Sequence, residues 1–403
     1  MKLAAAALVT LLAATANAEP PRSPESFATL LAKYDAATPT EREQLAPLVD
    51  AAAGQRYATR SRLYWYTDLD AAKAAAHAQK KPILALRMLG RLDEDLSCAN
   101  SRFFRVALYA NKDLSAYLRA NFILYWSTER AAPKITIDFG DGRVIERTIT
   151  GNSAHYVLDA EGRVLDVLPG LYAPSVFRAE LDKSLALATK LRGARTDADR
   201  IAAVRAYHAA GIAEEQRSFA KLADKQYDAR TQRLASADSA SRAQYATVSK
   251  AAVEVPMMKR FGARADMIPA DDTAQWAAIG RNAFGLGRDP YGMTTELLDA
   301  QSRELADALV DAKPAPAIEP WRRDVILAQF EQAIAGDTAI DELALRPRIR
   351  SIVCASDTLD FATINGRIYD YVFSTPSSDP YLGLLPRDTF TGLPADGLVR
   401  TEP

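Results

Sequence analysis

The most informative stretch of the sequence is HYVLDAEGRVLDVLPGL, residues 155–171, in which two apolar runs flank Asp159-Ala-Glu-Gly162. The runs are short and rich in Val and Leu, and the segment between them holds Asp and Gly, so the pattern predicts a β-hairpin. Nearly continuous apolar runs are typical of strands buried on both faces. Tyr172 to Leu191 has helical spacing, so we expect a helix to close this part of the chain.

Two further apolar runs upstream predict the centre of the sheet. An Ala-rich helix is predicted over Leu69–Lys80, and Lys81-Pro82 ends it. Ile83 to Leu86 and Phe122 to Trp126 are apolar throughout and suit strands covered on both faces. Because a helical connection separates them, we expect these two strands to pair in parallel.

The order of predicted elements defines an α/β domain over residues 62–191. A hairpin is predicted around Gly140-Asp-Gly142, so the full order is helix, strand, helix, strand, hairpin, hairpin, helix. We expect a central sheet of four or five strands with helices on both faces. Residues 19–61 are predicted to form an N-terminal helical segment. Residues 196–403 are predicted to form a mainly helical domain with a turn-rich tail from Ser374 onward.

Residues 1–18 have the three parts of a secretory signal peptide. Met1-Lys2 gives a positive start, Leu3 to Leu12 is a short apolar run, and Ala16-Asn-Ala18 is a small-residue cleavage site. An uncleaved anchor or a buried helix is the alternative interpretation. No later stretch is long and apolar enough to span a bilayer. We therefore expect an exported protein, periplasmic or extracellular, with no integral membrane segment after cleavage.

Composition excludes several classes of function. The 403 residues include 50 Lys and Arg against 51 Asp and Glu, a balance that argues against a nucleic-acid partner. Three His in no metal-binding spacing and two Cys argue against a metal centre and against a disulfide-dense scaffold. No motif for a cofactor is present, so none is expected.

The order of elements, with Lys81-Pro82 before a strand and a cysteine entering the next helix, resembles the thioredoxin-like superfamily, in particular its exported members. The closest match is Tyr156 to Arg163 followed by Leu168-Pro-Gly-Leu171. The resemblance is confined to residues 62–191 and implies a thioredoxin-like fold with thiol–disulfide chemistry. The chain departs from the family at two positions. Ser101 stands where a dithiol motif has its second cysteine, and Ser153 stands where the family has a cis-proline facing the dithiol.

Cys98 is the candidate nucleophile, with Ser101 and Ser153 beside it. A helix N-terminus stabilises a thiolate, and Cys98-Ala-Asn-Ser101 then forms a monothiol CxxS motif. Such a site forms mixed disulfides but has no local resolving thiol. We expect Asn152, Ser153 and Cys98 to line one small polar cleft, with the Ser153 hydroxyl donating to the Cys98 thiolate.

Two other interpretations of Cys98 remain open: a small buried packing residue, or a disulfide with Cys354. The sequence therefore supports two hypotheses about function. One is an exported thioredoxin-like protein with monothiol chemistry through Cys98, acting on protein thiols as a thiol-disulfide oxidoreductase or isomerase. The other is a redox-inactive thioredoxin-like module that binds a protein partner or has a structural role.

Overall fold

The computed structural model describes residues 22–148, 152–223, 238–244, 247, 272–286, 297–313, 318–373, 375, 378–381 and 393–394. The predicted signal peptide, residues 1–18, lies outside these ranges, as does most of the turn-rich tail. Among the described residues, no helix is long and apolar enough to cross a membrane.

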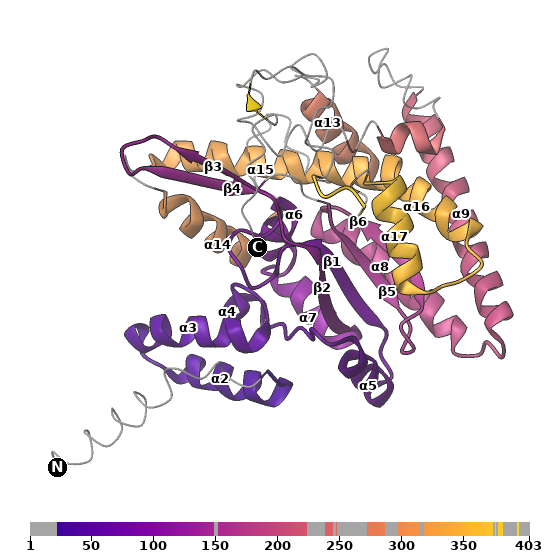
Figure 1. The fold of residues 1–403 in the computed structure, drawn as a ribbon, viewed down its shortest axis with the longest axis horizontal. Helices are drawn as coiled ribbons and strands as arrows, with labels where there is room; N and C mark the ends of the chain where they lie inside the picture. Colours follow the sequence, from indigo (N-terminus) through magenta and orange to yellow (C-terminus); the bar gives the residue numbers. More distant parts are fainter. Residues whose placement is uncertain are drawn as a thin grey trace.

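A four-stranded mixed sheet lies at the centre of the fold (Figure 1). Its strands stand in the order β2-β1-β5-β6, with bounds Ile123–Arg130, Ile83–Leu89, Ala154–Leu158 and Val164–Pro169. β1 and β2 are parallel, with Ile83 opposite Ile123, which confirms the predicted pairing. β5 is antiparallel to both β1 and β6, so the predicted hairpin around Asp159–Gly162 is confirmed.

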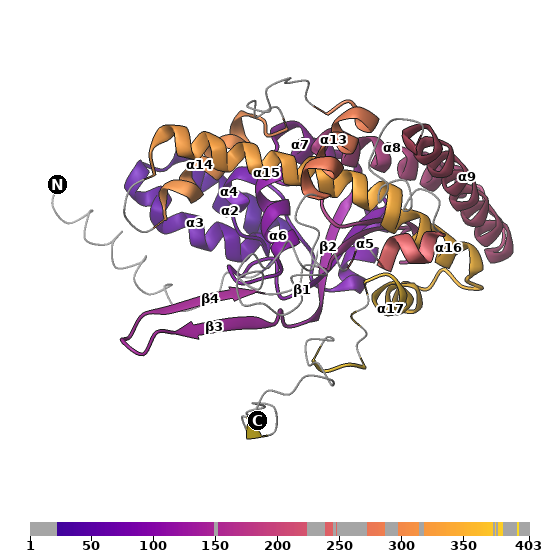
Figure 2. The same cartoon turned by 90° about the horizontal axis from the view of Figure 1, so that it is seen from above.

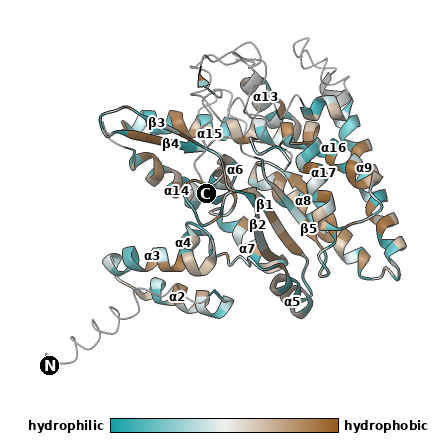
Figure 3. Cartoon of the chain, in the orientation of Figure 1, coloured by the Kyte–Doolittle hydropathy of each residue, from teal (hydrophilic) through white to brown (hydrophobic). Residues whose placement is uncertain are grey.

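The strands are buried because both faces of the sheet are covered. β5 and β6 are buried along their whole length, and β1 along all but one residue, in keeping with their continuous apolar runs. Helices α5 (Leu69–Gln79), α7 (Lys112–Asn121) and α8 (Pro174–Leu191) pack against the sheet. Figure 3 shows the hydrophobic character of β1 and β2 between these helices.

The second predicted hairpin forms a separate two-stranded sheet. β3 (Lys134–Asp138) and β4 (Val144–Thr148) pair antiparallel, and the hairpin projects from the rest of the molecule (Figure 2). Gly140 and Gly142 have φ values of 75° and 88°. Glycine adopts this left-handed region without strain, which is why the turn falls there.

The described part of the N-terminal segment is helical and contains α2 (Pro24–Ala36), α3 (Pro39–Ala53) and the short α4 (Ala58–Ser61). α2 and α3 pack on each other around a small cluster of their own. The buried Trp65 ties this segment to the sheet domain, since its indole N–H donates to Gln55 Oε1 at 2.6 Å.

The described residues after 196 are mostly helical, as predicted. The main helices are α9 (Asp197–Ala223), α13 (Asp272–Phe284), α14 (Ala300–Asp311), α15 (Pro320–Ile340), α16 (Arg346–Ala355) and α17 (Phe361–Tyr371). α15 runs along the molecule from α14 to α16 (Figures 1 and 2), and a π-helix, η3 (Asp341–Leu345), joins it to α16. One buried apolar cluster extends from Leu63 to Phe373, so the helices share their core with the sheet. The domain boundary between residues 191 and 196 stays a prediction.

Candidate functional site at the carboxyl end of β1

Cys98 lies at the carboxyl end of β1. Its backbone N–H donates to the carbonyl oxygen of Leu89, the last residue of β1, at 3.2 Å. It is the N-cap of helix α6 (Ala99–Phe103), which continues directly into a π-helix, η1 (Phe104–Leu108). The cysteine therefore occupies the predicted helix start, but its side chain is fully buried.

Ser101 is bonded to the polypeptide around Cys98. Its hydroxyl lies 2.7 Å from Ser97 Oγ and 2.8 Å from the carbonyl oxygen of Cys98, and all three residues are fully buried. A hydroxyl has one hydrogen to donate, and both of these acceptors lie within its reach. The position of the second cysteine of a dithiol motif is thus filled by a side chain that holds the turn into α6.

Arg105 holds the same turn from inside. Its guanidinium donates to Ser97 Oγ at 2.8 Å and to the Glu94 carbonyl oxygen at 2.8 Å, and only 2% of the residue is exposed. Burial lowers the pKa of Arg105 to about 10, so it remains a cation at neutral pH. It interacts electrostatically with Cys98, and a nearby cation favours a thiolate.

Ser153 lies at the same edge of the sheet, immediately before β5. The pairing of Arg87 with Ala154 places it beside the end of β1. Its carbonyl oxygen accepts a hydrogen bond from Gly170, but its buried hydroxyl has no hydrogen-bond partner among the described residues. The expected hydroxyl bond from Ser153 to the Cys98 sulfur is therefore not formed. Since Cys98, Ser101 and Ser153 all have 0% exposure, none of them lines a solvent-open cleft.

His155 occupies the apolar core behind this edge. Its Nε2 lies 2.7 Å from the Tyr109 hydroxyl oxygen, and the rings of Phe104 and Phe177 lie 4.7 and 4.8 Å from its own. Burial lowers the pKa of His155 to about 3, so the ring is neutral at physiological pH. The imidazole packs in the core rather than in a polar cleft.

The C-terminal helical region contacts the edge of the site through Asn152, a feature that the sequence did not predict. Asn152, on the site edge, donates to Thr375 Oγ1 at 3.2 Å, and its carbonyl oxygen accepts from the Tyr369 hydroxyl at 3.2 Å. Burial raises the pKa of Tyr369 well above its usual value, and nearby Tyr156, Glu129 and Cys98 add to the rise. The contacts join residues more than two hundred positions apart, and no local pattern signals them.

The second cysteine lies elsewhere. Cys354 is half-buried on α16, where its thiol lies 3.5 Å from the Arg205 carbonyl oxygen, and burial raises its pKa. Both cysteines are free thiols, so the Cys98–Cys354 disulfide is not formed in this structure. Among the described residues, no three His, Cys, Asp or Glu side chains are grouped so as to hold a metal ion.

Comparison with protein-family models, curated proteins and solved structures finds no match for this chain.

Proposed function

We propose that this chain is an exported thioredoxin-like protein without a redox cycle, whose α/β domain is a structural and protein-binding module. The strand order β2-β1-β5-β6, with a parallel pair, an antiparallel hairpin and a closing helix α8, supports the thioredoxin-like part of the proposal. Export rests on the signal-peptide pattern of residues 1–18.

The observation that carries the proposal is the complete burial of Cys98. Thiol–disulfide exchange requires a thiolate that another sulfur can approach. Cys98 has no exposed surface, and the hydroxyl at the resolving position, Ser101, bonds to Ser97 and to the Cys98 carbonyl. The competing monothiol function is favoured by the position of Cys98 at a helix start and by the nearby Arg105. The two proposals therefore make different predictions about how fast a thiol reagent reacts with Cys98 in the folded chain.

Alkylation of single-cysteine variants tests the proposal. In Cys354→Ser, we expect native Cys98 to react with iodoacetamide at least about 100-fold more slowly than in the unfolded chain, because a buried thiol reacts only when the structure opens. Its rate should rise with denaturant in step with unfolding. The matched variant, Cys98→Ser, leaves the half-buried Cys354, which we expect to be less protected.

Rapid alkylation of Cys98 in the folded chain, at or above the rate in the unfolded chain, contradicts the redox-inactive proposal. A mixed disulfide formed with glutathione under native conditions contradicts it as well. Either result assigns monothiol chemistry to Cys98.

A further inference from the structure

A cavity of about 570 Å³, here called the basic cavity, lies between the N-terminal helices, α7 and α14. Five cationic side chains line it: Arg42, Arg60, Arg62, Lys112 and Arg119. They come from α3, from α4 and its C-cap, and from α7. Cationic side chains from three helical elements thus line the basic cavity.

The two carboxylates that line the basic cavity are already paired. Arg62 holds Asp35 with both terminal nitrogens, at 2.6 and 2.7 Å, and this contact lowers the pKa of Asp35. Arg60 Nη2 lies 2.7 Å from Glu304 Oε1. Each carboxylate is neutralised by one of the five cations.

The other three cations, Arg42, Lys112 and Arg119, lie within 4 Å of no carboxylate of the described residues. Arg42 donates to the backbone carbonyl oxygens of Tyr34 and Asp35. Arg119 donates to the Ser61 carbonyl oxygen at 2.7 Å.

Lys112 is the exposed first residue of α7, next to Asp299. The Asp299 carboxylate accepts from the backbone N–H groups of Lys112 and Ser302, at 2.7 and 2.9 Å. It is thus directed at the backbone rather than at the Lys112 ammonium group.

The positive charges in the basic cavity repel one another, and this repulsion affects the pKa of Arg119. Burial and the nearby Arg62 guanidinium lower the pKa of Arg119, although a guanidinium keeps its proton at neutral pH. An anion bound between these groups would offset the repulsion. Arginine forks present paired N–H donors that match the oxygens of phosphate and carboxylate groups.

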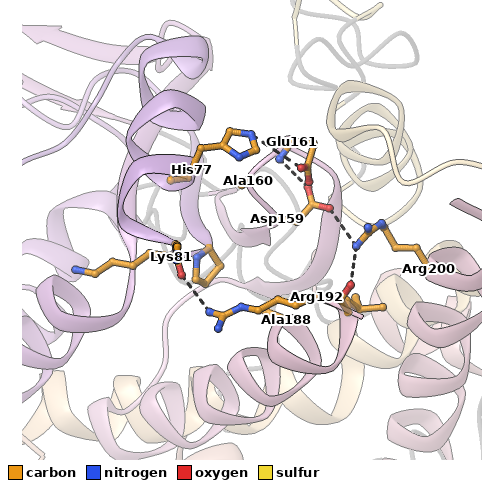
Figure 4. A pocket seen from close by; sticks show the side chains of 12 residues that line it. His77, Lys81, Asp159, Ala160, Glu161, Ala188, Arg192 and Arg200 are labelled. Atoms are coloured by element: carbon orange, nitrogen blue, oxygen red, sulfur yellow. Dashed lines mark hydrogen bonds and ion pairs between the residues drawn. The ribbon is translucent and has the colours of Figure 1, made fainter. Parts of the chain in front are cut away.

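A second cavity, of about 320 Å³, gives the contrast (Figure 4). It also has cations in its wall, but Asp159 and Glu161 face it, with Arg200 3.7 Å from Asp159 and His77 3.9 Å from Glu161. Cations and acids are interleaved there. Its four Lys and Arg side chains outnumber its two acids, but the excess is larger in the basic cavity, where five cations face two carboxylates.

We propose that the basic cavity binds a small multiply charged oxyanion, held by Arg42, Lys112 and Arg119. The shared chemistry is two or more negative charges on oxygen atoms, as in a phosphate ester or a polycarboxylate. The Thr59 side chain in the wall is a further hydroxyl group for its oxygens. This site lies away from Cys98 and is independent of whether Cys98 is reactive.

Calorimetric titration of the folded chain with pyrophosphate and, separately, with citrate tests this site. We expect binding of at least one anion that weakens with added salt, as for a site built from exposed charge. Lys112→Met and Arg119→Met should each weaken it at least about tenfold, while Lys134→Met, the same change on exposed β3, leaves it unchanged. Circular dichroism checks that each variant is folded.

The two ligands distinguish the source of the charge. Tighter binding of pyrophosphate assigns a phosphate-bearing ligand, and tighter binding of citrate a polycarboxylate. The proposal is overturned if neither anion binds, or if Lys112→Met and Arg119→Met bind as the parent chain does.

Discussion

Replacing Arg346 with Met is expected to reduce the free energy of unfolding by about 3–5 kcal/mol, because it removes the cation from a group of buried carboxylates. Arg346 is fully buried on α16. Its Nη2 lies 2.8 Å from Asp166 Oδ2, and its Nη1 lies 2.5 Å from Glu180 Oε2 and 2.6 Å from Glu342 Oε1. Without the guanidinium, these acids face one another with no counter-charge at that point.

The electrostatics of Asp166 show how much depends on this cation. Burial alone raises the pKa of a carboxyl group, yet Arg346 and Arg350 outweigh burial and hold the pKa of Asp166 well below its usual range. Asp166 thus remains ionised in the interior. Removing Arg346 leaves it buried with its main partner lost, the situation that costs most.

Urea unfolding followed by circular dichroism measures the effect. Arg346→Lys keeps a charge but not the two-nitrogen fork, so we expect an intermediate loss. Arg348→Met, on the same helix, is the matched control, with no carboxylate partner among the described residues and an expected loss under about 1 kcal/mol. Equal stability of Arg346→Met and Arg348→Met would show that the cluster is not needed. If Arg346→Met does not fold, Arg346→Lys against Arg348→Met gives the comparison.

This cluster is also what joins the two parts of the chain. Asp166 belongs to β6 and Glu180 to α8, whereas Glu342 and Arg346 belong to η3 and α16. The ion pairs therefore hold the helical region against the sheet, and the same region supplies Tyr369, which interacts electrostatically with Cys98. A domain held this way suits a structural or binding module better than a site that must open to a disulfide substrate.

The sequence predicts the sheet well because its signals are local. Ile83–Leu86 and Phe122–Trp126 are continuous apolar runs, and each hairpin has Gly in its turn. The position of Cys98 at a helix start is equally local. The contacts that the helical region makes at this edge are not local, since Thr375 and Tyr369 bond to Asn152 from more than two hundred residues away.

The buried ion pairs show the same limit more sharply. Asp166 stands inside the apolar run Val164–Leu168, and a charge within a buried strand is a sign that a partner exists. The partner, Arg346, is 180 residues away, and nothing in its neighbourhood distinguishes it from a surface arginine. The residues of the basic cavity show the same limit, because each one alone in the sequence is typical of a charged side chain on the surface.

Glu331, on α15, gives the second large expected effect, and it depends on pH. The residue is fully buried, Oε1 accepts from the Leu298 N–H at 3.2 Å, and Oε2 has no hydrogen-bond partner among the described residues. Burial raises its pKa to about 7, although Arg281 and Arg303 act in the opposite direction. The folded state therefore keeps a proton that the unfolded state releases near pH 4.5, the ordinary value for this group.

The sign follows from this difference: the stability contributed by the bound proton is fully present below pH 4.5 and is lost as the pH rises through about 7. Glu331→Gln keeps the acceptor and stays neutral, so at pH 8.5 we expect it to be more stable than the parent by up to about 3 kcal/mol, with little difference near pH 4.5. Urea unfolding at both pH values measures the difference in the free energy of unfolding between Glu331→Gln and the parent. The contributions of other titrating groups cancel in this difference because both proteins contain them. Glu319→Gln, at the exposed start of the same helix, should change stability by less than about 0.5 kcal/mol at either pH. A gap of the same size at both pH values, or a less stable Glu331→Gln at pH 8.5, would show that Glu331 does not titrate in the interior.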